Sequence, residues 1–209
     1  MKTPIYIVML LAAGCGTPQE NALRTGDLLF QTGRESAMNG AISAATGGDQ
    51  AVPFTHVGIA VCGDGADSVL EATSGGGVRM TSLPDFLGRS AEKDGKPVVV
   101  AMRLRDTAGV AEAVARARSF LGQPYDYSFR PDNGKIYCSE LVHASYLAPD
   151  GRPRFTARPM NFRAADGTMP AFWIELFGGA GEEIPQGVPG TNPNDLAREP
   201  ELEEIFRYY

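Results

Sequence analysis

The sequence predicts an α+β fold in which a small antiparallel sheet packs against helices. Short strand-like runs cluster in the middle of the chain and are separated by glycine-rich turns, with helical segments before and after them. The 209 residues are 43% hydrophobic and 21% charged, which is a normal balance for a globular protein and argues against disorder. This length suits one domain, which we place at residues 25–209.

The elements follow in order from their apolar patterns and turn signals. Strands are expected where apolar and β-branched residues run between turns, at 26–31, 55–62, 68–73, 77–80 and 97–104. Helices are expected at 34–46, at 82–87 as a single turn capped by Ser82, at 107–121 and at 138–147. The stretch 178–200 is rich in Gly, Pro and Asn; it is expected to be an ordered loop or tail, with room for a short helix at 201–209, and its role is left open.

The first 14 residues are expected to be a signal peptide of the lipoprotein type. Lys2 precedes an apolar run at 5–13, which is too short for the ~20 residues that span a bilayer core. Cys15 follows two alanines and a glycine, as in a bacterial lipobox, so we expect it to carry the lipid and residues 15–24 to form a tether. The expected location is the cell envelope, at the membrane; plain export and a buried N-terminal strand are the alternatives.

Charge and composition narrow the function classes. The net charge of −6 and the pI of about 5.0 do not suit a nucleic-acid partner, which needs a basic surface. Two histidines and three cysteines provide no repeated Cys/His pairs for a metal, and no cofactor is expected.

A predicted hairpin places a histidine beside a carboxylate. Gly63-Asp64-Gly65 joins two strand-like runs, and cross-strand partners in an antiparallel hairpin have numbers with a constant sum. A turn at 63–64 sets His56 opposite Glu71, whereas a turn at 64–65 makes Glu71 its diagonal neighbour on the same face. Glu71 would then fix the tautomer of His56 and raise its basicity. The alternative is a histidine at a strand end and a solvated glutamate.

The small residues on the face of this hairpin support the first interpretation. Val57 and Ile59 point to one face with Leu70, and this face is expected to be the core. Gly58 and Ala60 share the opposite face with His56 and leave room for a helix beneath the imidazole.

Cys138 is the candidate nucleophile because it opens a predicted helix. A thiol in the first turn lies near the positive end of the helix dipole and near unpaired backbone N–H groups, which favour a thiolate and could bind an oxyanion. A buried apolar role is the alternative for a single cysteine. His143, on the same helix, cannot easily reach this thiol, which leaves His56 as the base. We interpret Cys62 as structural, with a disulfide to Cys138 left open.

With these residues in hand, the chain resembles the circularly permuted branch of the NlpC-type papain-like amidases and peptidases, in particular its YiiX-like lipoproteins. The resemblance runs from about residue 25 to the end, and His56 precedes Cys138 in the permuted order. It is carried by the segments 26–30 (GDLLF), 55–59 (THVGI), 69–72 (VLEA), 125–127 (YDY), 137–142 (YCSELV) and 190–196 (GTNPNDL).

This resemblance implies a papain-like core with Cys138, His56 and Glu71 as a catalytic triad. It also implies cleavage of amide bonds in peptides or cell-wall-derived fragments, and it places Tyr125, Tyr127 and Tyr137 at a substrate pocket; packing aromatics are the alternative for these tyrosines.

The leading hypothesis is therefore an exported, lipid-anchored thiol hydrolase of amide bonds that acts through an acyl-enzyme. Its substrate would be a peptide or a small molecule containing an amino acid. Thiol acyltransfer or ester cleavage on lipids is a neighbouring alternative. A non-catalytic lipoprotein that binds small ligands is the alternative from another class.

Overall fold

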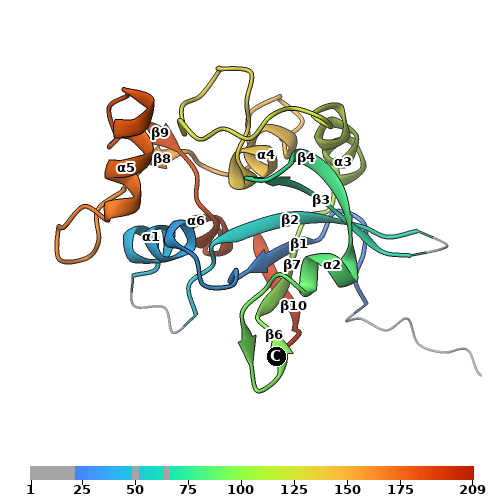
Figure 1. Ribbon diagram of the computed structural model, residues 1–209. Coiled ribbons are helices and arrows are strands. Elements are labelled where there is room, and N and C mark those ends of the chain that lie inside the picture. The colour runs from blue at the N-terminus through green and yellow to red at the C-terminus, as the bar shows by residue number, and fades with distance from the viewer. Residues whose placement is uncertain (1–21, 49–51, 64–65) are drawn as a thin grey trace, which may run out of the picture.

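The computed structural model describes residues 22–48, 52–63 and 66–209. The expected signal peptide, Cys15 and most of the tether lie outside the described residues, as do Asp64 and Gly65 of the hairpin turn. The described chain is built on a six-stranded antiparallel sheet, ordered β10-β7-β1-β2-β3-β4 (Figure 1). These strands are β1 (Leu28–Gln31), β2 (His56–Val61), β3 (Ser68–Thr73), β4 (Gly77–Ser82), β7 (Val99–Leu104) and β10 (Leu202–Arg207).

Six helices and two short strand pairs complete the described fold. The helices are α1 (Ala37–Thr46), α2 (Leu83–Leu87), α3 (Val110–Ser119), α4 (Cys138–Ser145), α5 (Ala171–Ala180) and α6 (Pro193–Ala197). The short pairs are β5 (Glu92–Lys93) with β6 (Lys96–Pro97), and β8 (Arg158–Pro159) with β9 (Pro189–Gly190). The α+β class expected from the sequence, with an antiparallel sheet packed against helices, is confirmed.

Helices cover both faces of the sheet, and two hydrophobic clusters result. α3 and α4 lie on one face and α2 on the other, while α1, α5 and α6 gather at one end (Figure 1). The larger cluster joins the inward side chains of β1, β2 and β3, including Val57, Ile59 and Leu70, to those of α3 and α4. The smaller cluster packs Phe86 of α2 against Ala60 and other residues of the opposite face. The expected core face and the expected covered face are therefore both present.

The register of the central hairpin is the second of the two expected. Ile59 pairs with Leu70 and Ala60 with Val69, so Glu71 is the diagonal neighbour of His56 and shares its face. Gly58 explains how α2 comes so close, because a Cβ there would lie 3.2 Å from the Phe86 ring and 2.4 Å from a Val69 methyl. The small residues of β2 thus allow α2 to pack beneath the imidazole.

The C-terminal region differs from the expectation. Residues 201–209 do not form a helix; instead β10 pairs antiparallel with β7 and extends the sheet by one strand. Leu202 is buried while its neighbours are more exposed, and the pairing satisfies backbone groups along the edge of β7 that a helix would leave unpaired. The stretch 178–200, expected to be loop or tail, contains the end of α5, the short strand β9 and the helix α6.

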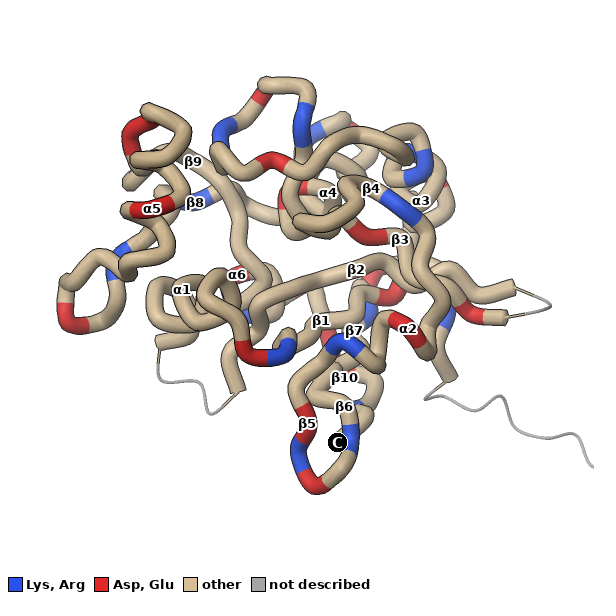
Figure 2. The backbone as a smooth tube through the Cα atoms, viewed as in Figure 1, with Lys and Arg blue, Asp and Glu red and all other residues tan. Residues whose placement is uncertain are grey.

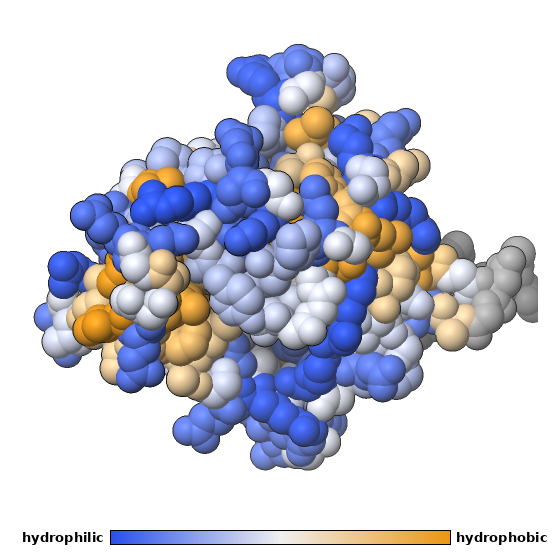
Figure 3. Space-filling model, turned by 45° about the horizontal axis from the view of Figure 1, so that its top comes forward, coloured by the Kyte–Doolittle hydropathy of each residue, from blue (hydrophilic) through white to orange (hydrophobic). Residues whose placement is uncertain are grey.

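The described surface mixes charges of both signs and carries few large exposed apolar side chains. Figure 2 shows Lys and Arg interspersed with Asp and Glu over the surface loops and helices. Apolar residues gather in two areas of the face shown in Figure 3, one on the left and one to the right of centre. Ile174 of α5 is 55% exposed. Within the described part of the chain, no helix has the length and apolar character needed to cross a bilayer.

Candidate active site

Cys138 is the first residue of α4, and its thiol is positioned by the way that this helix begins. Tyr137 has an extended backbone (φ −99°, ψ 172°) immediately before the helix, and its N–H donates to the Glu140 carboxylate at 3.3 Å. The backbone N–H groups of the first turn have no carbonyl partner within the helix, and Cys138 lies in this same turn. Cys138 is 5% exposed. The helix start thus combines a nucleophilic atom with hydrogen-bond donors.

His56 begins β2, and its imidazole contacts Glu71 of β3. The Nε2 atom lies 2.7 Å from the Glu71 carboxylate, which accepts a hydrogen bond from it. An ionised carboxylate can only accept, so Nε2 carries the proton and Nδ1 is the nitrogen left for the thiol. The imidazole also packs on the Phe86 ring, with centroids 5.9 Å apart. Contacts on both sides fix the orientation of the ring.

Glu71 is fully buried and receives several donors. Thr81 donates its hydroxyl to the carboxylate at 2.6 Å, and the Arg89 guanidinium donates to the same oxygen, Oε1. Burial raises the pKa of this carboxyl, but the hydrogen bonds from His56, Thr81 and Arg89 outweigh burial and lower its pKa to about 2. Glu71 is therefore a fixed negative charge behind the imidazole at any pH at which the protein works.

The pKa of His56 moves in the opposite direction. Burial lowers it, but interactions with the Cys138 thiol and the Glu71 carboxylate outweigh burial and raise it from 6.5 to about 10. The side chain retains 17% exposure. A raised native pKa stabilises the fold fully below the unfolded value of 6.5, and this contribution is lost as the pH rises from 6.5 to about 10. The structure thus places a positively polarised ring between Cys138 and Glu71.

The other cysteine and histidine candidates are not part of this arrangement. Cys62 and Cys138 are both free thiols, so the disulfide left open by the sequence is absent from the described chain. Burial raises the pKa of Cys62 to about 11, and its backbone is held by the Thr25 hydroxyl. Burial lowers the pKa of His143, whose nearest acceptor is the Phe155 backbone. Neither residue lines the cavities described below.

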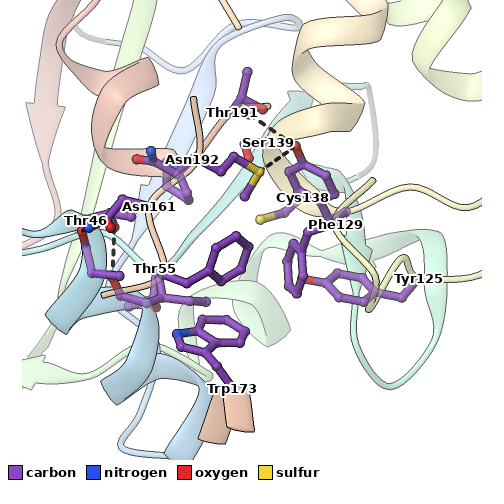
Figure 4. A pocket seen from close by; sticks show the side chains of 16 residues that line it. Thr46, Thr55, Tyr125, Phe129, Cys138, Ser139, Asn161, Trp173, Thr191 and Asn192 are labelled. Carbon is purple, nitrogen blue, oxygen red and sulfur yellow. Dashed lines mark hydrogen bonds between the residues drawn. The ribbon is translucent and has the colours of Figure 1, made fainter. Parts of the chain in front are cut away.

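Two cavities meet at the thiol and the imidazole, and we name each after the group that lines it. The thiol cavity is lined by Cys138 and by aromatic and small side chains (Figure 4). The imidazole cavity is lined by His56 and mostly by polar side chains. Ile42, Thr55 and Tyr125 line both, so the two cavities form one cleft with Cys138 on one side and His56 on the other.

The three tyrosines expected at a substrate pocket take different places. Tyr125 and Tyr137 are buried and line the thiol cavity. Burial and the charge of Cys138 raise the pKa of Tyr125, which keeps its hydroxyl protonated. Tyr127 is 41% exposed and lines neither cavity; its hydroxyl donates to the Ser74 carbonyl at 2.7 Å, and its ring contacts Tyr125.

The C-terminal segment forms part of the site. Thr191 donates its backbone N–H to the Tyr137 hydroxyl at 3.1 Å and lines the thiol cavity. Asn194, fully buried in α6, accepts from the Phe54 N–H at 2.7 Å and donates to the Phe54 carbonyl at 2.8 Å. These bonds hold the segment that leads into His56. A Cβ on Gly190 would lie 2.3 Å from the Met160 sulfur and 2.8 Å from the Tyr137 hydroxyl, so any side chain here would have to displace these groups.

Sequence reasoning missed the donors to Glu71 and most of the aromatic lining. Arg79 pairs with Glu71 across β3 and β4, and Thr81 lies two residues along on the same face. The glycine-rich turn at 74–77 sets the pairing of β3 with β4, and this pairing predicts that both residues lie near Glu71. The turn at 63–65 predicted the position of His56 in the same way. Arg89 follows α2 and has no such signal. The rings of Phe162 and Trp173 come from segments without a recognisable pattern.

The chain is similar to known proteins over most of its length. Residues 22–206 match the model of the Peptidase_C92 family, described as permuted papain-like amidase enzymes, YaeF/YiiX. The chain is 28% identical to the uncharacterized protein YiiX of Escherichia coli (strain K12) over 211 residues, 99% of this chain and 96% of YiiX.

A solved structure shares the fold. The crystal structure of YiiX from Escherichia coli O157:H7 superposes with a TM-score of 0.72 and 25% identity, covering 89% of this chain and 98% of that one. Its title calls that protein a metalloprotein. Within residues 22–48, 52–63 and 66–209 of the present chain, no group of three His, Cys, Asp or Glu side chains could hold a metal ion. With the matching fold and a family model that covers most of its length, the chain belongs to the permuted papain-like amidases of the YaeF/YiiX (C92) family.

Proposed function

We propose that the protein is a thiol amidase in which Cys138, His56 and Glu71 act as nucleophile, base and orienting carboxylate. The observation that carries this proposal is the position of the imidazole: it interacts with the Cys138 thiol and the Glu71 carboxylate, and both raise its pKa. Such a constellation activates a thiol for acyl transfer. Membership of an amidase family favours the amide bond as the substrate.

In the proposed reaction, Cys138 reacts as a thiolate beside the protonated imidazole of His56, which already carries a proton on Nδ1, and the sulfur attacks the substrate carbonyl. The negative oxygen of the tetrahedral intermediate accepts hydrogen bonds from the Cys138 N–H and from the Tyr125 hydroxyl, which its raised pKa keeps protonated. His56 then protonates the leaving amine, and a thioester remains on Cys138. Water, deprotonated by His56, attacks the thioester, and the acid and the free thiol are released.

Alkylation by iodoacetamide, which is small and neutral, tests the nucleophile. We expect one equivalent to react rapidly at neutral pH, and peptide mass mapping should locate the label on Cys138. Cys138→Ala is expected to abolish the rapid phase and the hydrolysis of amide substrates. Cys62→Ala is the matched control and is expected to leave both unchanged, because that thiol has a raised pKa. Slow labelling that His56→Ala does not reduce further would favour a binding protein without catalysis.

We also propose that the enzyme is an exported lipoprotein that acts at the cell envelope on peptides or on small molecules that contain an amino acid. The support is the apolar run at 5–13 followed by Cys15, which resembles a lipobox. Incorporation of a labelled fatty acid in cells is expected for the full chain and should disappear in Cys15→Ala. A chain that takes up no label, or takes it up equally in the variant, would contradict the anchor.

A further inference from the structure

The two cavities of the cleft differ in chemistry, and the reaction assigns a different part of the substrate to each. In thiol amide hydrolysis the acyl part stays bonded to the sulfur, while the amine leaves with a proton from the imidazole. The acyl part must therefore lie on the side of Cys138, and the amine part on the side of His56. This assignment rests on the proposed function, because it holds only if these two residues act on the amide.

We propose that the thiol cavity selects a compact, uncharged, apolar acyl group, such as the acyl side of an aromatic or branched amino acid, and that the imidazole cavity receives a polar amine part. Among the described residues that line the thiol cavity, none is Asp, Glu, Lys or Arg. A charged acyl group entering this cavity would lose its hydration without gaining a partner of opposite charge.

Five aromatic residues contribute to the wall of the thiol cavity. Phe129, Phe162 and Trp173 pack edge to face, with centroids between 5.1 and 5.9 Å apart, and all three are buried. Figure 4 shows Phe129 and Trp173 among the side chains that line this cavity together with the Cys138 thiol. Edges and faces of rings in this arrangement suit a further ring or a branched alkyl group.

Phe129 is held in this wall at a conformational cost. Its φ of 50° lies in the left-handed region, where a bulky side chain is an outlier. The buried Asp126 carboxylate imposes this turn by accepting from the Ser128 N–H at 2.8 Å and the Arg130 N–H at 2.9 Å. The turn places one ring against four others, those of Tyr125, Tyr137, Phe162 and Trp173. We therefore assign Phe129 as a residue that determines specificity on the acyl side.

The imidazole cavity has the opposite character. Besides His56, its lining includes the amide side chains Gln31 and Asn39, the Ser74 hydroxyl and the Arg89 guanidinium. Arg89 already contacts Glu71 and retains 39% exposure of its side chain, so it can meet a carboxylate on the leaving amine. An amino acid or peptide released as the amine product carries such a carboxylate.

Two chloromethyl ketones that differ only on the acyl side test the selection. N-acetyl-phenylalanine and N-acetyl-aspartate chloromethyl ketones each present one side chain next to the carbonyl that the thiol attacks. We expect the phenylalanine reagent to alkylate Cys138 at least about 10-fold faster than the aspartate reagent. The rates are followed by intact-protein mass spectrometry, with iodoacetamide as the neutral reference for thiol reactivity.

Variants of the wall extend the test. Phe129→Gly removes the ring and suits the positive φ, whereas Phe129→Ala removes the ring and keeps the strained backbone. In both variants, the rate of alkylation by a larger naphthylalanine reagent, relative to the rate with the phenylalanine reagent, is expected to be higher than in the wild type. Met160→Lys, which places a cation in the lining, is expected to favour the aspartate reagent. Met80→Lys, on the surface and in neither cavity, is the matched control and should keep the wild-type ratio. Thermal unfolding checks that each variant folds.

The outcomes separate the two proposals. If iodoacetamide labels Cys138 but the aspartate reagent reacts as fast as the phenylalanine reagent, the selection is overturned and the thiol amidase remains. Unchanged reagent ratios in Met160→Lys and both Phe129 variants, in folded protein, also overturn the selection. If no reagent labels Cys138, the proposed function fails and the assignment of the cavities fails with it.

Discussion

Replacement of His56 by alanine is expected to lower kcat/KM for amide hydrolysis by about 10⁴-fold or more. The imidazole is proposed to keep Cys138 as a thiolate, to give its proton to the leaving amine and to activate water, so each chemical step loses its acid or base. Nothing else lining the cleft can replace it among the described residues, because His143 lies elsewhere on α4 and lines neither cavity. Initial rates with a peptide amide at low substrate concentration measure the effect.

The pH dependence of stability is a second measurement on His56→Ala, and a fold that is damaged in general would not change it. Wild-type protein is expected to lose stability relative to His56→Ala as the pH rises from 6.5 towards 10, because the native imidazole keeps its proton over this range and the unfolded one does not. Urea unfolding of both proteins across the range measures the difference. An activity loss below tenfold, or a pH-independent difference in stability, would contradict the role assigned to His56.

Asp27→Asn is expected to destabilise the fold by about 3–5 kcal/mol, since it breaks a buried ion pair and leaves the partner charge behind. Asp27 lies just before β1, is 2% exposed and accepts two hydrogen bonds from the Arg103 guanidinium, at 2.7 and 2.8 Å. It also accepts from the Arg24 N–H. These bonds join the start of β1 to β7 at the centre of the sheet. Equilibrium unfolding in urea measures the loss.

Glu203→Gln is the matched control for this prediction. Glu203 also pairs with an arginine, Arg105, at 3.0 Å, but the two side chains are 41% and 61% exposed. A pair in solvent is expected to contribute at most about 1 kcal/mol. A loss in Asp27→Asn no larger than that in Glu203→Gln would show that burial does not set the strength of the Asp27–Arg103 pair.

The central hairpin and the start of α4 could be predicted from the sequence for local reasons. Alternation along two strands leaves only two registers that keep His56 and Glu71 on one face, and either brings them together. The helix that Cys138 opens follows from a turn and an amphipathic pattern, neither of which depends on distant segments. In each case, all the residues on which the prediction depends lie within about 20 consecutive positions.

The acyl-side wall and the last strand could not be predicted, because each depends on partners that are distant in sequence. Phe129, Phe162 and Trp173 become one cluster only when three separate segments fold together. Residues 202–207 form a strand because the edge of β7 is open to pair with them, and this tertiary partner outweighs a local pattern that left room for a helix. Arg89 reaches Glu71 only because Phe86 seats α2 on the sheet.

The bonds from Thr191 to Tyr137 and from Asn194 to Phe54 have a consequence for biosynthesis. Both reach back to residues synthesised long before, by 54 and 140 positions, so the surroundings of the thiol are incomplete while the ribosome is still adding residues up to 190. A nascent or truncated polypeptide would therefore carry a cysteine without its finished pocket. A polypeptide that stops before α6 lacks the bonds that Thr191 and Asn194 make, so the surroundings of Cys138 take their final form only after α6 has been synthesised.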